Sequence, residues 1–165
     1  RSKEKKINNP WYYEMQELGY HYRITDIQCA LGLSQLKKIN KFLTKRKNLA
    51  KRYDFELKDL KNCKIVHEGL RNNSSNHLYI LKINFMKLGI SRGKLMKLFK
   101  EKEIGTQVHY IPVPSHPYFK HKGFNNNNLP NSYEYYEGAL SIPLYYDLTR
   151  KQQTHVINQV KKLIG

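Results

Sequence analysis

The sequence predicts an α/β or α+β fold, in which a layer of helices packs on a small sheet. Apolar residues at helical spacing follow Asp26 and recur in the last fifteen residues, and short apolar runs with strand character lie between them. The predicted order is helix, strand, helix, strand, helix, strand, helix. A chain of 165 residues can bury the core of one domain but not of two.

The first helix is predicted to begin at Asp26. Thr25 is a favourable N-cap residue, and Gln28 lies three residues on, where it completes a capping box. The helical pattern continues to Tyr53, with one interruption near Ile39-Asn40. Residues 1–18 read as a charged loop that is anchored from Trp11 onwards.

The middle of the chain alternates strands and helices. Residues 78–83 form a strand that is apolar on both faces, and Ser91 caps a helix that passes through Phe99 and ends at Ile104-Gly105. Residues 106–110 are predicted to form a second strand.

The last part of the chain begins with a long loop from Ile111 to Pro130, which is rich in proline and asparagine. Loops of this length are often functional. A helix is predicted to start at Asn131, with Glu134 three residues on, and a strand follows over 140–144. Thr149 and Gln152 then cap the final helix.

The formal net charge of +17 suggests a polyanionic partner, and a basic nucleic-acid-binding module is the alternative function class. The excess is diffuse, however. It includes a row of lysines at helical spacing, which usually marks a solvated helix face. No aromatic RNA-binding strand, zinc-finger spacing or basic zipper accompanies the charge, so we expect no nucleic-acid partner. The lysines of that row are Lys37, Lys38, Lys41, Lys45, Lys47 and Lys51.

Two cysteines, Cys29 and Cys63, cannot build a disulfide framework and read as reduced thiols of a cytoplasmic protein. No apolar run approaches the roughly 18 residues of a membrane span, so we expect no membrane partner. His109, His116 and His121 lack the spacing of a metal site, so no metal ligand is predicted.

The segment Tyr20-His21-Tyr22-Arg23 lies just before the predicted N-terminus of the first helix. Free backbone N–H groups and the helix dipole favour an anion at such a place, and a guanidinium can bind phosphate with two hydrogen bonds. Because Asp26 already satisfies part of the helix end, an anion would lie further out, near His21 and Arg23. The alternative is that the tyrosines pack and that Arg23 is a solvated surface charge.

Several motifs resemble the DegT/DnrJ/EryC1/StrS family of sugar-nucleotide aminotransferases, which are pyridoxal-phosphate enzymes of the aspartate-aminotransferase fold. The likeness extends over nearly all of residues 11–163. Within the family it resembles most the 4-aminotransferases of pseudaminic acid biosynthesis. The motifs are Trp11-Tyr12-Tyr13-Glu14, residues 18–28, residues 30–36, Ser74-Ser75-Asn76-His77-Leu78-Tyr79, residues 108–113 and Leu140-Ser141-Ile142-Pro143-Leu144.

The resemblance implies the small C-terminal domain of a fold-type I pyridoxal-phosphate enzyme, with helices on one face of a short, mainly antiparallel sheet. Residues 1–25 would be a connecting segment and interface loop, and residues 26–165 the small domain. The large domain, which in the family carries the Schiff-base lysine and most of the cofactor contacts, is not in this sequence. No catalytic residue is therefore assigned here. Arg1-Ser2 resembles the family's Arg-Ser-His-Gly, although Lys3-Glu4 follows.

The resemblance also implies site residues. Arg23 matches a family arginine, and His21 stands where the family has an asparagine that reaches the partner subunit's cofactor phosphate. Both are expected to bind pyridoxal 5'-phosphate across a homodimer interface. His109, Tyr110 and Tyr118 are expected near the nucleotide-sugar site, with ordinary packing at a strand end as the alternative. Pro114 replaces a histidine that relatives often carry.

The expected function is therefore that of a cytoplasmic UDP-4-keto-6-deoxy-N-acetylhexosamine 4-aminotransferase. It would take its amino group from L-glutamate and serve pseudaminic acid synthesis. A related aminotransferase of another 4-amino sugar pathway remains open, as does the epimer of the keto sugar.

Overall fold

The computed structural model describes residues 15, 17–124 and 129–165, and the chain divides into two compact units after Lys37. Each unit is described by itself. The expectations for Arg1-Ser2 and for the segment anchored at Trp11 lie outside the described residues.

Helix α1 (Asp26–Leu36) lies in the described part of the first unit. Its predicted capping box is confirmed, because the Thr25 hydroxyl accepts from the Gln28 amide at 3.4 Å and the Gln28 side chain accepts from the Thr25 amide at 2.9 Å. The helix buries none of its side chains, and Ile27 is 83% exposed. Local capping signals therefore define α1 without the support of a core.

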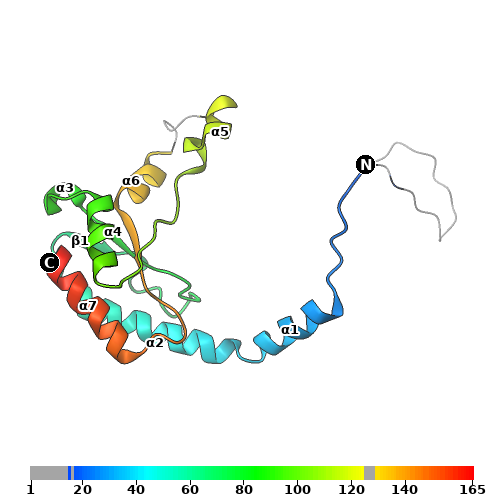
Figure 1. The fold of residues 1–165 in the computed structure, drawn as a ribbon, viewed down its shortest axis with the longest axis horizontal. Coiled ribbons are helices and arrows are strands. Elements are labelled where there is room, and N and C mark those ends of the chain that lie inside the picture. The colour runs from blue at the N-terminus through cyan, green and yellow to red at the C-terminus, as the bar shows by residue number, and fades with distance from the viewer. Residues whose placement is uncertain (1–14, 16, 125–128) are drawn as a thin grey trace. The chain divides into compact units, whose positions relative to one another are not determined.

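The second unit holds the remaining elements (Figure 1). In chain order they are α2 (Ile39–Leu57), β1 (Cys63–Ile65), β2 (Tyr79–Ile83), α3 (Phe85–Leu88), α4 (Arg92–Glu101), the 3-10 turn η1 (Val113–Ser115), α5 (Pro117–His121), α6 (Pro130–Gly138), β3 (Ala139–Ile142) and α7 (Arg150–Ile164). None of the helices that the structure describes is long and apolar enough to cross a membrane.

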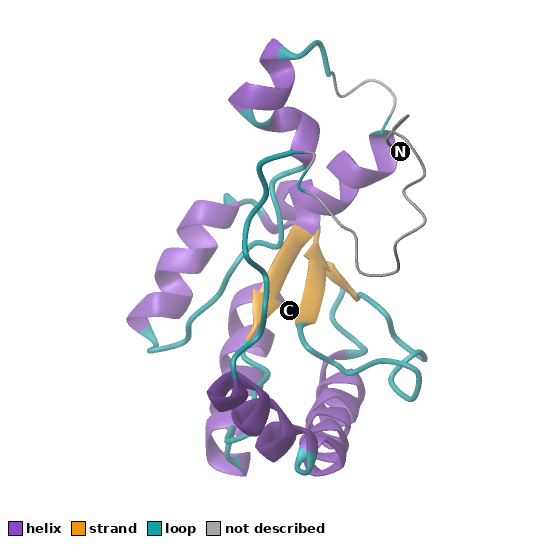
Figure 2. Cartoon of the chain, turned by 90° about the vertical axis from the view of Figure 1, so that its right-hand side faces the viewer, coloured by secondary structure: helices purple, strands orange, loops and turns teal. Residues whose placement is uncertain are grey.

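The three strands form one antiparallel sheet in the order β1-β2-β3, which Figure 2 shows in orange. Leu81 at its centre faces Ile65 on one neighbour and Leu140 on the other. Because side chains alternate along a strand, Tyr79, Leu81 and Ile83 share one face with Leu140, while Ile80 and its partner Ser141 share the opposite face.

Helices α2, α4 and α7 cover the Leu81 face. The buried cluster on that side draws Tyr53 from α2, Phe99 from α4 and Val160 from α7, and each of these three side chains is fully buried. The predicted fold class, helices on one face of a short antiparallel sheet, is therefore confirmed. The opposite face carries Ile80 and Ser141, which are 8% and 6% exposed.

A buried ion pair joins the loop before β2 to α2. Arg71 Nη2 lies 2.9 Å from Asp54 Oδ1, the same carboxylate oxygen accepts from the Tyr79 hydroxyl at 2.9 Å, and the guanidinium stacks over the Tyr79 ring. A carboxylate that accepts from both partners is well satisfied, as a largely buried charge must be.

Arg46 of α2 makes a second link between distant segments. Its Nη1 donates to the backbone carbonyls of Asn76 at 3.4 Å, His77 at 3.0 Å and Leu144 at 3.2 Å. It therefore joins the entrance to β2 and the exit from β3 to one helix.

Two predictions are wrong: the strand over residues 106–110 and the end of the helix that Ser91 caps. Residues 106–110 do not form a strand: Gln107 alone bridges to Ser141, and the next amide, Val108 N–H, donates to the Gln107 side chain at 2.9 Å. This local hydrogen bond competes with a ladder. Helix α4 ends before Gly105, because Glu103 takes the left-handed conformation (φ 58°) and Ile104 N–H donates to Phe99 at 2.9 Å, which closes a Schellman motif.

The start of α6 also differs from the prediction. The helix begins at Pro130 without a side-chain cap, since the fixed φ of proline suits the first helical position. Glu134, the predicted capping partner, instead pairs with Lys82 at 2.5 Å. The interruption of the first helical run falls at Lys37-Lys38, slightly earlier than predicted.

Candidate functional site

The segment 106–110 runs alongside β3 at the edge of the sheet. Gln107 and Ser141 exchange backbone hydrogen bonds of 3.2 and 2.8 Å, which fix the chain beside β3. Two residues further on, His109 Nδ1 lies 2.8 Å from the Ser141 hydroxyl. The imidazole is half-buried, and its Nε2 has no partner among the residues that the structure describes.

Tyr110 continues this segment into solvent. It is 72% exposed, and its ring meets the His109 ring edge to face at 4.7 Å between centroids. Its hydroxyl has no partner in the described part of the chain. A phenol that is free at its polar end and braced at its ring can donate to a ligand and can stack on one.

Tyr118 lies on the short helix α5 and is 66% exposed. The ammonium of Lys122 lies 5.8 Å from its ring centroid, and the Phe119 ring packs against it edge to face. The turn before α5 is tied to α6 by a 2.7 Å hydrogen bond between the Ser115 and Tyr133 hydroxyls. The ring of His109 packs against Tyr110, and the ring of Tyr118 packs against Phe119. The predicted residues of the nucleotide site thus belong to two separate ring pairs.

His21 and Arg23 lie in the first unit, just before α1, and both are exposed. The neighbouring rings of Tyr20 and Tyr22 meet at 6.0 Å between centroids. Neither His21 nor Arg23 has a hydrogen bond or an ion pair within the described residues, so both can bind an anion. The capping box occupies the Gln28 amide, which leaves the side chains as the stronger anion ligands at this helix end.

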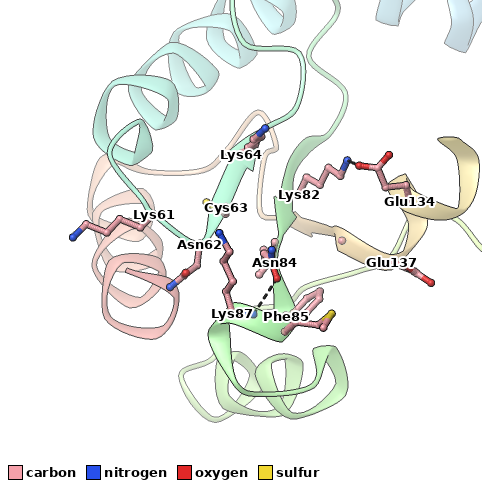
Figure 3. A pocket seen from close by; sticks show the side chains of 13 residues that line it. Lys61, Asn62, Cys63, Lys64, Lys82, Asn84, Phe85, Lys87, Glu134 and Glu137 are labelled. Atoms are coloured by element: carbon pink, nitrogen blue, oxygen red, sulfur yellow. Dashed lines mark hydrogen bonds and ion pairs between the residues drawn. The ribbon is translucent and has the colours of Figure 1, made fainter.

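A hollow of about 420 Å³ lies elsewhere, between β1, β2, α3 and α6. Figure 3 shows that its lysines do not converge: Lys61 points away from the other side chains, and Lys82 points to Glu134. That ion pair lowers the pKa of Glu134, and burial raises the pKa of the Cys63 thiol to about 11. An apolar floor with diverging cations does not form a site for a small anion, and none of the predicted site residues lines it.

Ser141 was missed as a site residue by reasoning from the sequence. Its signal is a hydroxyl within an apolar strand, in Leu140-Ser141-Ile142, at a position that is only 6% exposed. A buried hydroxyl needs a partner, and the structure supplies His109. No group of three or more potential metal-ligating side chains gathers within residues 15, 17–124 and 129–165.

Helices packed on a small antiparallel sheet are the architecture of the small domain of fold-type I aminotransferases. A family model confirms the class: it matches residues 2–161 and describes the DegT/DnrJ/EryC1/StrS aminotransferase family. The chain belongs to that family.

Two curated relatives agree. The chain is 36% identical to an uncharacterised protein of Methanocaldococcus jannaschii over 94% of this chain and 40% of that protein. It is 35% identical to the spore coat polysaccharide biosynthesis protein SpsC of Bacillus subtilis, over 95% of this chain and 41% of that protein. The chain thus spans about two fifths of the length of these relatives.

Solved structures give the same answer. Helicobacter pylori PseC, an aminotransferase involved in pseudaminic acid biosynthesis, matches with a TM-score of 0.82 at 28% identity, over 94% of this chain and 42% of PseC. The pyridoxal-phosphate form of Spr1654, described as a putative sugar aminotransferase from Streptococcus pneumoniae, matches with a TM-score of 0.79 at 27% identity, over 93% of this chain and 39% of that one.

Proposed function

We propose that this chain is the C-terminal portion of a pyridoxal-phosphate-dependent sugar-nucleotide 4-aminotransferase. In this proposal L-glutamate gives the amino group, and a UDP-linked 4-keto-6-deoxy-N-acetylhexosamine receives it. The product would enter pseudaminic acid synthesis in the cytoplasm. The likeness to PseC over nearly the whole chain is the observation that carries the substrate class.

The residues of the first unit suit a cofactor phosphate. When bound, pyridoxal phosphate supplies the electron sink for amino transfer, and the family places its lysine in the large domain. The guanidinium of Arg23 and the imidazole of His21 are exposed and unpartnered among the described residues, so they can donate to phosphate oxygens. In the proposed homodimer, each chain supplies this pair to the cofactor of its partner.

The residues after α4 suit the nucleotide sugar. His109 and Tyr110 offer a ring nitrogen and a hydroxyl side by side, and neither atom has a partner among the described residues. Diphosphate and uracil present hydrogen-bond acceptors to such donors, and uracil has a face on which a ring can stack. Tyr118, with Lys122 near its ring, would contribute a further aromatic face beside a positive charge.

The first test uses the full-length protein. It should carry a visible absorption band from bound cofactor, which bleaches when glutamate is added and returns when the UDP-4-keto sugar is added. A purified protein without such a band would contradict the enzyme function. A band that responds to glutamate but not to this keto sugar would support an aminotransferase and contradict the proposed sugar substrate.

Two substitutions separate the proposed roles. Arg23→Ala removes a charge-assisted contact to the cofactor and should weaken cofactor binding roughly ten- to a hundredfold. Tyr110→Phe keeps the ring and loses one hydroxyl. It should raise KM for the nucleotide sugar and leave the glutamate half-reaction nearly unchanged, because glutamate needs no nucleotide pocket. Equal losses in both half-reactions for Tyr110→Phe would contradict the nucleotide assignment.

A second substrate is favoured by the likeness to SpsC, whose name refers to spore coat polysaccharide. In that case the acceptor would be the keto sugar of another 4-amino sugar pathway. Parallel assays with the two keto sugars decide between them, since the correct acceptor should give the larger kcat/KM.

A further inference from the structure

Ser141 links the sheet to the exposed polar segment. It lies within β3, opposite Ile80 of β2, on the face that the core helices do not cover. Its neighbours in the strand, Leu140 and Ile142, belong to the buried apolar cluster. The rigid strand therefore fixes the position of the Ser141 hydroxyl.

The same residue fixes both the backbone and the ring of the polar segment. Its N–H donates to Gln107 O at 2.8 Å, and its carbonyl accepts from Gln107 N–H at 3.2 Å. Its hydroxyl lies 2.8 Å from His109 Nδ1. The Gln107 bonds set the path of the chain two residues before the imidazole, and the hydroxyl bond sets the ring's rotation.

The hydrogen bond at Nδ1 also bears on the protonation of the other ring nitrogen. In the neutral ring only one nitrogen carries a hydrogen, and the Ser141 hydroxyl can either donate to Nδ1 or accept from it. When the Ser141 hydroxyl donates to Nδ1, the hydrogen lies on Nε2, and Nε2 becomes a donor. A donor is what phosphate oxygens and uracil carbonyls require.

We propose that Ser141 is a positioning residue of the nucleotide site, which holds His109 so that Nε2–H donates to the UDP portion of the substrate. The inference rests on the proposed function, because it requires His109 to contact the nucleotide. Ser141 itself touches no substrate and acts through His109.

The test is a double-mutant cycle on the full-length enzyme, with the Kd of UDP measured by calorimetry. We expect His109→Ala to weaken UDP binding about tenfold and Ser141→Ala about three- to tenfold. The double variant should bind UDP as weakly as His109→Ala alone, because Ser141 has no ring left to position. The glutamate half-reaction should not change in any of the three variants.

A merely structural serine gives a different pattern. Ser141→Ala would then weaken binding by the same factor in both backgrounds, and such additivity would overturn the inference. Thr154→Val is the matched control, because it deletes a hydroxyl on α7 that accepts a hydrogen bond from Arg52 on α2. This variant should leave UDP binding unchanged. If it weakens UDP binding as much as Ser141→Ala does, the effect of Ser141→Ala is a general loss of stability and the inference falls.

Two further outcomes separate this inference from the function on which it rests. If His109→Ala leaves UDP binding unchanged, the nucleotide assignment and the inference both fail. If His109→Ala weakens binding and Ser141→Ala does not, only the positioning role is overturned. Should Ser141→Ala not fold, Ser141→Cys keeps the size of the side chain with a weaker donor, and UDP binding equal to wild type would overturn the inference.

Discussion

Helices α1 and α7 start with the same capping motif but differ in burial. Thr25 with Gln28 and Thr149 with Gln152 both form complete capping boxes. Yet α7 buries five side chains, among them Val156, Ile157 and Val160, whereas α1 buries none.

The difference separates two kinds of information. A capping box satisfies orphan backbone groups at a helix end, so it determines where a helix starts. Burial of an apolar face determines whether that helix contributes to the stability of the fold. In the second unit both are present, and in the first unit the chain as described supplies only the cap.

The largest expected contrast lies in the arginines. Arg71→Ala leaves the largely buried carboxylate of Asp54 without its cation and should lower the free energy of unfolding by about 3–5 kcal/mol. Arg23→Ala, at an exposed position without a described partner, should change it by less than about 0.5 kcal/mol. Urea unfolding of the 165-residue chain, followed by circular dichroism, measures both. Similar losses of unfolding free energy for Arg71→Ala and Arg23→Ala would contradict the difference between the two units.

The second largest contrast is expected when an apolar side chain is shortened to alanine in each unit. Ile157→Ala opens a cavity beside the sheet and should lower the free energy of unfolding by about 3 kcal/mol, within the usual range for such changes. Ile27→Ala, at an exposed helix position, should be close to neutral in the same urea titration. A large loss for Ile27→Ala would mean that α1 packs within this chain after all.

The two caps give a smaller and more direct test. Thr149→Ala should lower the global free energy of unfolding by about 1 kcal/mol, because α7 belongs to the cooperative core. Thr25→Ala should reduce helix content before the transition without moving its midpoint. Thr149→Ser, which keeps the capping hydroxyl, is the control and should stay near wild type.

A further contrast is a pH dependence of the free energy of unfolding that Cys63 of the second unit produces. Burial raises the pKa of Cys63 from 9.0 to about 11, so the unfolded chain releases this proton at lower pH than the folded one. Stability is therefore complete below pH 9 and falls as the pH rises towards 11. In a Cys29→Ala background, Cys63→Ala should remove the drop between pH 9 and 10. Above pH 10 the buried hydroxyls of Tyr53 and Tyr79, whose pKa values are also raised, add to the loss.

The sequence predicted best where one local signal decides the structure. Thr25, Ser91 and Thr149 marked three helix starts, and alternating apolar residues marked β2. It failed where another contact competes with the expected one. Glu134 pairs with Lys82 across the fold rather than capping α6. Glu103 takes the left-handed conformation expected of Gly105, because the Ile104 amide closes a local turn onto Phe99. Strand β1, with three residues, exists because β2 offers it an edge.

The candidate site divides in the same way. A local motif that resembles the family pointed to His109 and Tyr110, and the structure brings their rings into contact. The role proposed for Ser141 depends on a hydrogen bond across 32 positions of the chain, which no local pattern reports. The roles of His21, Arg23, His109, Tyr110 and Tyr118 remain predictions.

The three carbonyls held by Arg46 have a dynamic consequence. Two of them precede β2 and the third follows β3, so one guanidinium closes both connections. If either connection swings away, the side chain that holds the other loses part of its hydrogen bonding. The two connections should therefore behave as one opening unit in native-state hydrogen exchange, although they lie far apart in the chain.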